Sequence, residues 1–122
     1  GVPHPRSYGV FPTTFRKYVR GETRAEEPKE VGKTILTLQE AVRKITSFPA
    51  SKLGIQDRGL IRENMWADIT VFDLENITDQ ATYADPHQFP RGIPYVIVNG
   101  EVAVENEELT GARPGRILRH SK

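Results

Sequence analysis

Cysteine is absent from this 122-residue sequence, which excludes disulfide bonds and metal sites built from thiolates. Long apolar runs are missing too, because no stretch approaches the roughly 18 residues of a membrane-spanning helix. No signal-peptide pattern opens the chain. We therefore expect a soluble protein with no membrane partner, and the lack of cysteine is consistent with a cytoplasmic location.

An excess of charge of either sign is also lacking. The sequence has 17 basic and 16 acidic side chains, a formal net charge of +1, and the two signs are interleaved along most of its length. No broad electrostatic field is present to attract nucleic acid, so nucleic acid is not an expected partner. Only the tail 113–122 is locally basic, and we interpret it as a solvated chain end.

Recognisable catalytic motifs are scarce. The three histidines, His4, His87 and His120, do not have the spacing that lets neighbouring side chains converge on one metal ion. No serine has the flanking glycines of a nucleophile elbow, and the carboxylates are not arranged as a catalytic pair. We expect no catalytic residue and no bound metal in this chain alone, and we interpret His87 as a structural hydrogen-bonding group.

The first third of the sequence predicts a loop, a short helix and a linker. Prolines in His4–Pro12 favour an extended loop, because each proline disfavours helix in the residue before it. Helical spacing of apolar residues in Phe15–Val19 predicts a short helix that ends at Gly21. The charged segment Glu22–Lys33 is typical of a mobile linker or a surface loop.

A second helical region has clearer start and stop signals. Thr37 and Glu40 form a capping box, in which each side chain bonds the other's backbone amide. Pro49 is expected to end this helix and to start a second one over Pro49–Leu53, which Gly54 then closes with a left-handed cap. One apolar stripe is predicted on the first helix, formed by Leu38, Ala41, Val42 and Ile45.

The second half of the sequence predicts strands. Ala67–Asp73 carries large apolar residues on both faces, as in a strand that is buried on two sides. Asn99–Gly100 separates two alternating runs, Tyr95–Val98 and Glu101–Val104, which is a strong hairpin signal. We expect Ala67–Asp73 to pair with this hairpin.

A two-residue turn also fixes the register of the predicted hairpin. Ile97 should face Val102, and Tyr95 should face Val104. One face of the hairpin would then be wholly apolar and would need to be covered.

The segment His4–Pro12, which reads HPRSYGVFP, is the best candidate for a binding site. It combines the Arg6 guanidinium with the imidazole of His4 and the phenol of Tyr8. The planar fork of an arginine suits bidentate binding of a carboxylate. The alternative interpretation is that Arg6 pairs with a surface acid and Tyr8 only packs.

Several segments together resemble one enzyme family. Leu53–Asp73 resembles the run with which amidohydrolase-superfamily enzymes leave the last barrel helix and enter a small β domain. His4–Pro12 resembles the "HPR.(Y/W)GTFPR" motif of the N-acyl-D-amino-acid deacylases (D-aminoacylases), although Val10 and Thr13 replace the usual Thr and Arg. Further segments resemble the same family in the same order: Thr37–Ala50, Asp85–Ile93, Tyr95–Gly100 and Thr110–Arg119.

One departure from the family pattern carries a backbone prediction. The family usually has Glu-Gly before the strand, where this chain has Glu63 and Asn64. That glycine is expected to have positive φ, and asparagine is the best tolerated substitute there.

The resemblance implies an α+β fold, the C-terminal fragment of a metal-dependent amidohydrolase. Helices from the end of the (β/α)₈ barrel would pack on a small β-sheet or β-sandwich (composite) domain. Residues 1–33 would be the post-barrel loop, short helix and charged linker, and residues 34–122 the C-terminal helices and small β domain. A chain of 122 residues cannot include the roughly 250-residue barrel itself.

The same resemblance implies the function. The parent enzyme would hydrolyse N-acyl-D-amino acids with zinc held by barrel residues, and Arg6 would grip the substrate carboxylate while His4 and Tyr8 shape its surroundings. The fragment alone would be inactive, with the missing barrel domain as its partner. Self-association through apolar surface on Phe11–Val19 and the Leu38 helix is also expected.

Two alternatives remain open at this stage. The chain could be a stand-alone, non-catalytic interaction module, which a reading frame that starts here would support. It could instead belong to another amidohydrolase, such as a dihydroorotase-like or hydantoinase-like enzyme. The Arg6 motif disfavours the second alternative, because cyclic-amide substrates are not similarly matched by it.

Overall fold

A computed structural model describes residues 3–29 and 32–119, so His120 and the end of the basic tail lie outside the described residues. The chain divides into two compact units. One unit is formed by Gly1–Ala41 and Phe72–Gly92, and the other by Val42–Val71 and Ile93–Lys122. Among the described residues, no helix has both the length and the apolar character to cross a membrane.

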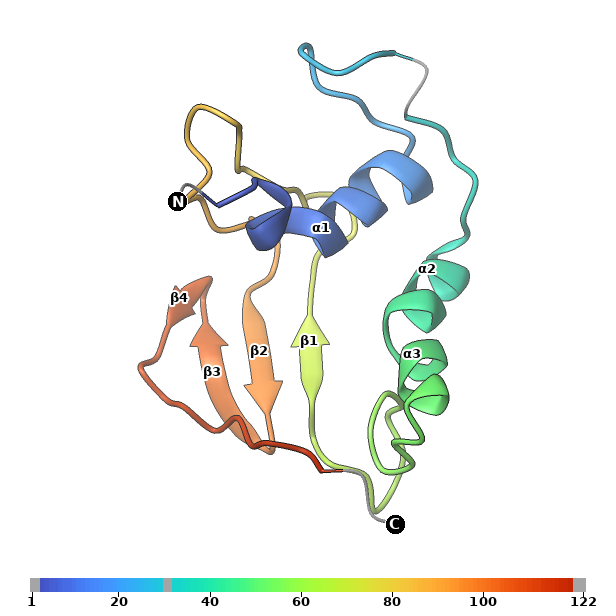
Figure 1. The fold of residues 1–122 in the computed structure, drawn as a ribbon, viewed down its shortest axis with the longest axis vertical. Coiled ribbons are helices and arrows are strands. Elements are labelled where there is room, and N and C mark those ends of the chain that lie inside the picture. The colour runs from blue at the N-terminus through green and yellow to red at the C-terminus, as the bar shows by residue number, and fades with distance from the viewer. Residues whose placement is uncertain (1–2, 30–31, 120–122) are drawn as a thin grey trace. The chain divides into compact units, whose positions relative to one another are not determined.

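The first unit begins with a long helix rather than a loop (Figure 1). Helix α1 covers Arg6–Thr14 and continues as a π-helical turn, η1, over Phe15–Val19. The expected extended loop at His4–Pro12 is therefore wrong. Pro5 lies at the N-cap with φ −50°, where the fixed proline dihedral fits a helix start, and the ring of Pro12 is buried inside the helix.

The end of this helix agrees with the sequence. Gly21 has φ +76°, the left-handed conformation expected for the residue that stops a helix. The Arg20 amide donates to the Phe15 carbonyl at 3.0 Å, which is the five-residue spacing of a π turn, and the Glu22 amide donates to the Arg16 carbonyl at 2.9 Å.

The core of the first unit joins this helix to the segment around residue 77. Phe15 and Ile77 are 3% and 2% exposed, and the rings of Phe15 and Phe72 have centroids 4.8 Å apart. At Gly9 the helix approaches Asp79 so closely that an added Cβ would lie 2.6 Å from the Asp79 Cβ. The glycine is what permits this close approach.

The second unit contains a four-stranded antiparallel sheet with strand order β1-β2-β3-β4 (Figure 1). Its strands are β1 (Ile69–Val71), β2 (Tyr95–Val98), β3 (Glu101–Glu105) and β4 (Glu108–Leu109). The predicted pairing of the first strand with the hairpin is confirmed. Burial of that strand on both faces is not found, because Thr70 and Val71 are exposed, Val71 by 44%.

The hairpin is confirmed, with one change of register. Asn99 and Gly100 have φ +51° and +84°, as a type I′ turn requires. Ile97 faces Val102 as expected, but Tyr95 faces Glu105 instead of Val104. The register shifts between Val96 and Ile97, so β3 holds one extra residue, a β-bulge that a turn-based prediction does not foresee.

Two short helices, α2 (Leu38–Ile45) and α3 (Ser47–Lys52), follow the charged loop. The capping box is confirmed: the Thr37 amide donates to the Glu40 carboxylate at 3.1 Å, and the Glu40 amide donates to the Thr37 hydroxyl at 3.2 Å. The break between the helices falls at Thr46, with φ −127°, and not at Pro49. Pro49 lies in the first turn of α3, where no amide hydrogen is needed, so the break comes earlier than the proline.

Two predicted backbone conformations are also confirmed. Gly54 has φ +71° at the end of α3, and Asn64 has φ +66°, which is the value that a glycine normally provides.

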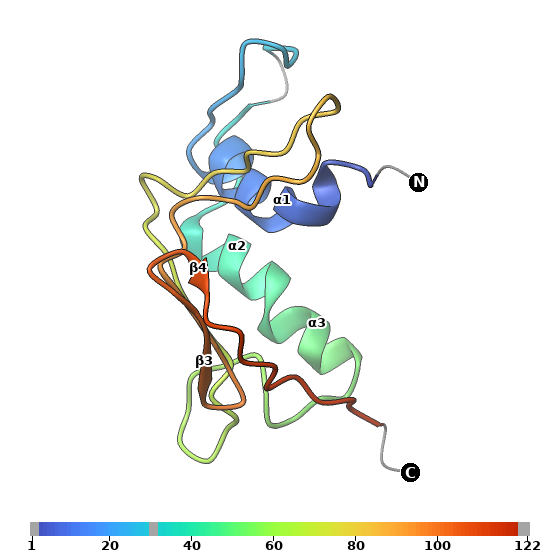
Figure 2. The ribbon, with the colours of Figure 1, turned by 90° about the vertical axis from the view of Figure 1, so that its left-hand side faces the viewer.

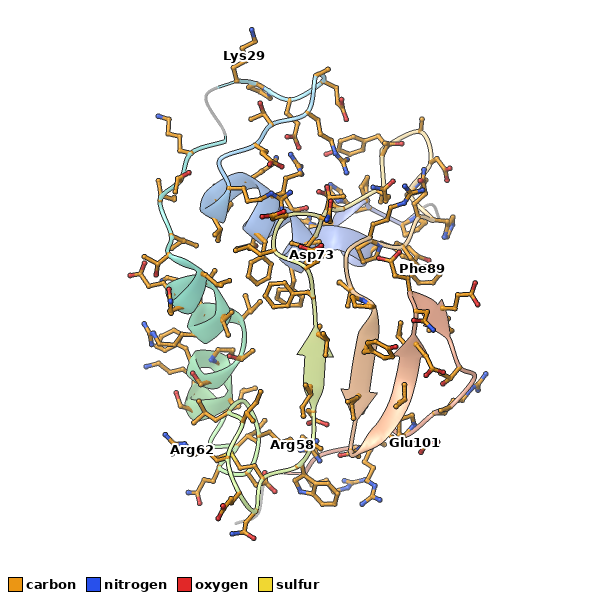
Figure 3. The ribbon with its side chains drawn as sticks, turned by 180° about the vertical axis from the view of Figure 1, so that it is seen from behind. Lys29, Arg58, Arg62, Asp73, Phe89 and Glu101 are labelled. Carbon is orange, nitrogen blue, oxygen red and sulfur yellow. The ribbon has the colours of Figure 1, made fainter. Side chains whose placement is uncertain are left out.

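An aromatic stack fixes the C-terminal segment within the second unit. The guanidinium carbons of Arg58 and Arg116 each lie 5.1 Å from the centre of the Trp66 ring. Asn99 accepts a hydrogen bond from Arg58 at 2.6 Å and donates one to the Pro114 carbonyl at 2.6 Å. Figure 3 shows Arg58 near the same end of the sheet as the start of β3.

Candidate functional site

Arg6 is the first residue of α1, and its side chain is exposed. Within residues 3–29 and 32–119, the guanidinium forms no hydrogen bond and no ion pair. The pairing with a surface acid that we considered as an alternative is therefore absent from the described part of the chain. An exposed guanidinium with all its donors free can bind an anion bidentately.

His4 connects the start of α1 to a distant loop. The Arg6 amide donates to His4 Nδ1 at 3.1 Å, and His4 Nε2 lies 3.2 Å from the Tyr83 hydroxyl. The two rings also meet edge to face, with centroids 5.2 Å apart and an interplanar angle of 80°.

Tyr8 makes a similar connection one turn further along the helix. Its hydroxyl lies 3.0 Å from His87 Nδ1, and its ring meets the rings of His87 and Phe89 edge to face at 5.7 Å and 5.5 Å. The expectation that His87 is a hydrogen-bonding group agrees with this contact. Figures 1 and 2 both show the loop 82–89 beside the N-terminal end of α1.

Two side-chain contacts, one before and one after Arg6 in the sequence, join this end of the helix to the same loop. His4 pairs with Tyr83 and Tyr8 pairs with His87, and each pair is separated by 79 residues in the sequence. Residues on either side of Arg6 therefore contact one loop, while the Arg6 side chain has no partner among the described residues. The sequence motif contains His4, Arg6 and Tyr8, whereas Tyr83 has no sequence signal because it is an isolated tyrosine in a loop.

A buried ion-pair cluster anchors the same helix at its other end. Arg16 is 4% exposed, and its Nε donates to Asp79 at 2.8 Å. Its two terminal nitrogens donate to the two oxygens of Glu27 at 2.9 Å each. Lys17 lies 2.7 Å from Glu27, and Arg24 lies 3.3 Å from Asp79.

The electrostatics of the cluster favour its charged forms. The hydrogen bond from Arg16 lowers the pKa of Glu27 to about 2, against an opposing effect of burial and with further help from Lys17 and the Arg24 amide. Burial by itself lowers the pKa of Arg16, but the hydrogen bonds and charges of Glu27 and Asp79 outweigh it and raise that pKa.

This cluster changes the interpretation of the charged loop. We expected Glu22–Lys33 to be a mobile linker or a surface loop, and its described residues are indeed irregular. Glu27 and Arg24, however, fix the loop to Arg16 of η1 and to Asp79. The sequence suggested charge in this segment, but it gave no indication of the partner 63 residues from Arg16.

The described residues do not form a metal-binding site. Across residues 3–29 and 32–119, no group of three or more His, Cys, Asp or Glu side chains could hold a metal ion. These residues do not fit a zinc site by themselves. What the described residues do offer is the exposed Arg6 guanidinium, which has no hydrogen-bond or ion-pair partner among them.

Comparison with known proteins identifies the class. A model of the amidohydrolase family matches residues 3–104, and the chain belongs to this family. An N-acyl-D-glutamate deacylase of Alcaligenes xylosoxydans xylosoxydans is 42% identical over 117 residues, which are 96% of this chain and 22% of that protein. An N-acyl-D-aspartate deacylase of the same organism is 36% identical over 95% of this chain and 21% of its own length.

Two solved structures also match this chain. The crystal structure of a D-aminoacylase matches with a TM-score of 0.82 and 35% identity, over 97% of this chain and 23% of that one. The N-acyl-D-glutamate deacylase from Bordetella bronchiseptica, complexed with zinc and a phosphonate inhibitor, matches with a TM-score of 0.79 and 34% identity, over 97% of this chain and 22% of that one. The resemblance to N-acyl-D-amino-acid deacylases is thus confirmed, and the chain spans about a fifth of the length of these relatives.

Proposed function

We propose that this chain is the C-terminal part of a zinc-dependent enzyme that hydrolyses N-acyl-D-amino acids. Cleavage of the amide bond would release a carboxylic acid and a free D-amino acid. The proposal is supported by the names of the relatives and by the share of their length, 21–23%, that this chain spans. The metal ligands and the reacting groups are assigned to the remaining part of the enzyme.

The architecture proposed for the complete enzyme follows from the same comparison. The helices of this chain are taken to adjoin a barrel domain supplied by the rest of the enzyme, with the four-stranded sheet as part of a small β domain. Val10 and Phe11 on α1 are 48% and 55% exposed, and we assign their apolar surface to contact with that barrel. A cytoplasmic location is part of the proposal.

Within this enzyme, Arg6 is proposed to bind the carboxylate that all N-acyl-D-amino acids share. The observation that carries this assignment is the exposed, unpaired guanidinium at the start of a helix that is tied down at both ends. The planar guanidinium can bind a carboxylate through two parallel hydrogen bonds, and the helix fixes the backbone from which the side chain extends. Binding of this kind holds the substrate while the amide bond reacts elsewhere.

The test is the Arg6→Met substitution in the enzyme expressed from its complete reading frame. Loss of a hydrogen-bonded charge pair is expected to raise KM for an N-acetyl-D-amino acid roughly 10- to 100-fold, with a smaller change in kcat. Arg113→Met, which removes another exposed arginine, is the matched control and should leave KM unchanged. An unaltered KM in the Arg6 variant contradicts the assignment.

The isolated 122-residue chain provides a second test. We expect no hydrolysis of N-acetyl-D-amino acids above a zinc-only blank, because the reacting groups are assigned to the rest of the enzyme. Turnover by the isolated chain would overturn this division of roles. Activity of the complete enzyme on cyclic amides, without activity on N-acyl-D-amino acids, would favour the hydantoinase-like alternative.

A further inference from the structure

The hydrogen bonds of His4 determine where its ring carries a hydrogen. The Arg6 amide donates to Nδ1 at 3.1 Å, so Nδ1 is the acceptor nitrogen. A neutral imidazole with an unprotonated Nδ1 carries its hydrogen on Nε2. Since Nε2 lies 3.2 Å from the Tyr83 oxygen, the Nε2 hydrogen is donated to that oxygen.

The Tyr83 hydroxyl is consequently held by His4 but keeps its own hydrogen free. A tyrosine hydroxyl can accept a bond at its oxygen while it donates its hydrogen elsewhere. Tyr83 is 81% exposed, and in the described part of the chain its hydroxyl has no hydrogen-bond partner besides His4. The edge-to-face contact with His4 restricts the ring itself. The result is a positioned hydrogen-bond donor that faces solvent.

The His4 ring links this donor to the backbone of Arg6. A single imidazole ring contacts the Arg6 backbone through one nitrogen and Tyr83 through the other. The bridge from Tyr8 to His87 holds the same loop against the helix on the other side of Arg6. Figures 1 and 2 show the loop 82–89 beside this end of α1.

We propose that the Tyr83 hydroxyl donates a second hydrogen bond to the substrate carboxylate that Arg6 binds, and that His4 is a positioning residue for this hydroxyl. This inference rests on the proposed function and deepens it. A carboxylate offers acceptor sites on both oxygens, so a guanidinium and a hydroxyl can bind it together. The loop 82–89 thereby becomes one wall of the substrate site.

The experiment uses the Tyr83→Phe variant of the complete enzyme, which removes only the hydroxyl and keeps the ring against His4. KM for an N-acetyl-D-amino acid should rise roughly tenfold, the effect of one hydrogen bond to a charged group, while kcat changes by less than about twofold. Tyr95→Phe is the matched control. Its hydroxyl bonds Asn106 at 3.3 Å in the other unit, and its loss should leave KM unchanged.

Double variants show whether Arg6 and Tyr83 bind the same carboxylate or act independently. If Arg6 and Tyr83 bind the same carboxylate, Tyr83→Phe should raise KM much less when Arg6→Met is already present. The His4→Phe variant should reproduce the KM effect of Tyr83→Phe, and combining the two should add little. A purely structural role of His4 would instead change kcat and stability with no such coupling to the hydroxyl.

The outcomes distinguish this inference from the proposed function. If Arg6→Met raises KM and Tyr83→Phe does not, the role of Tyr83 is overturned and that of Arg6 stands. If Arg6→Met has no effect, the carboxylate assignment of the proposed function fails, and the shared site fails with it. Fully additive effects in the Arg6 and Tyr83 double variant also overturn the shared carboxylate.

Discussion

Arg16 donates two parallel hydrogen bonds to the two carboxylate oxygens of Glu27, each 2.9 Å long. The guanidinium is almost completely buried, while the carboxylate lies on a loop that the sequence describes only as charged. A bidentate pair of this kind fixes both distance and orientation. The loop 22–27 is therefore part of the folded unit that carries Arg6.

Removal of the Glu27 charge should destabilise the first unit. Glu27→Gln is expected to lower the free energy of unfolding by about 2 kcal/mol, because a hydrogen bond to a charged group contributes about 1.5–3 kcal/mol and Asp79 still pairs with Arg16. Urea unfolding of the 122-residue chain measures this difference. The exposed neighbour Glu26, changed to Gln, is the control and should have almost no effect.

The contribution of Glu27 to the free energy of unfolding should decrease as the pH is lowered. Its pKa falls from an ordinary 4.5 to about 2 in the folded chain, chiefly through the Arg16 hydrogen bond. A depressed pKa gives stability that is present above the unfolded value and is lost as the pH falls toward the folded value. The difference in unfolding free energy between the original chain and Glu27→Gln should therefore shrink between about pH 5 and pH 2. A difference that stays constant over this window contradicts the ion-pair account.

Close packing of α1 against Asp79 makes Gly9 sensitive to substitution. A Cβ at this position would lie 2.6 Å from the Asp79 Cβ, so Gly9→Ala should push the helix away and destabilise the chain by about 1–3 kcal/mol. Thermal unfolding measures the loss. Gly115→Ala is the control, since an added Cβ there meets nothing within 4 Å and should leave the melting temperature nearly unchanged.

The Trp66 stack predicts how the C-terminal segment is held. Trp66 is the only tryptophan in the sequence, so its fluorescence reports this site alone. Arg116→Ala should expose one face of the ring, increase quenching by acrylamide and lower stability by about 0.5–1 kcal/mol. Arg119→Ala removes a nearby exposed arginine, and equal quenching in the two variants would show that Arg116 does not cover the ring.

Much of the local structure could be predicted from neighbouring residues. The Thr37 and Glu40 capping box and the Asn99–Gly100 turn follow from side-chain chemistry within three or four positions. The positive φ of Asn64 was predicted from the family pattern, which has glycine at that position. The family motifs likewise identified the amidohydrolase family, which the matched residues 3–104 confirm.

Local rules failed where packing decided between allowed alternatives. Pro5 and Pro12 suggested an extended loop, yet Pro5 lies at the N-cap of α1, where its dihedral fits, and Pro12 lies inside the helix with its side chain buried. The bulge in β3, which moves Tyr95 from Val104 to Glu105, also has no signal in the alternation of residue types.

The sequence alone thus determined the caps, turns and family of this protein, and it singled out Arg6 as a candidate binding residue. Only the tertiary structure showed that His4 and Tyr83 meet across 79 residues, and that Arg16 meets Asp79 across 63. The physical reason is that caps and turns depend on interactions within a few residues, which the order of residue types specifies directly. Long-range pairs depend on which segments the folded chain brings together, and no local pattern contains that information.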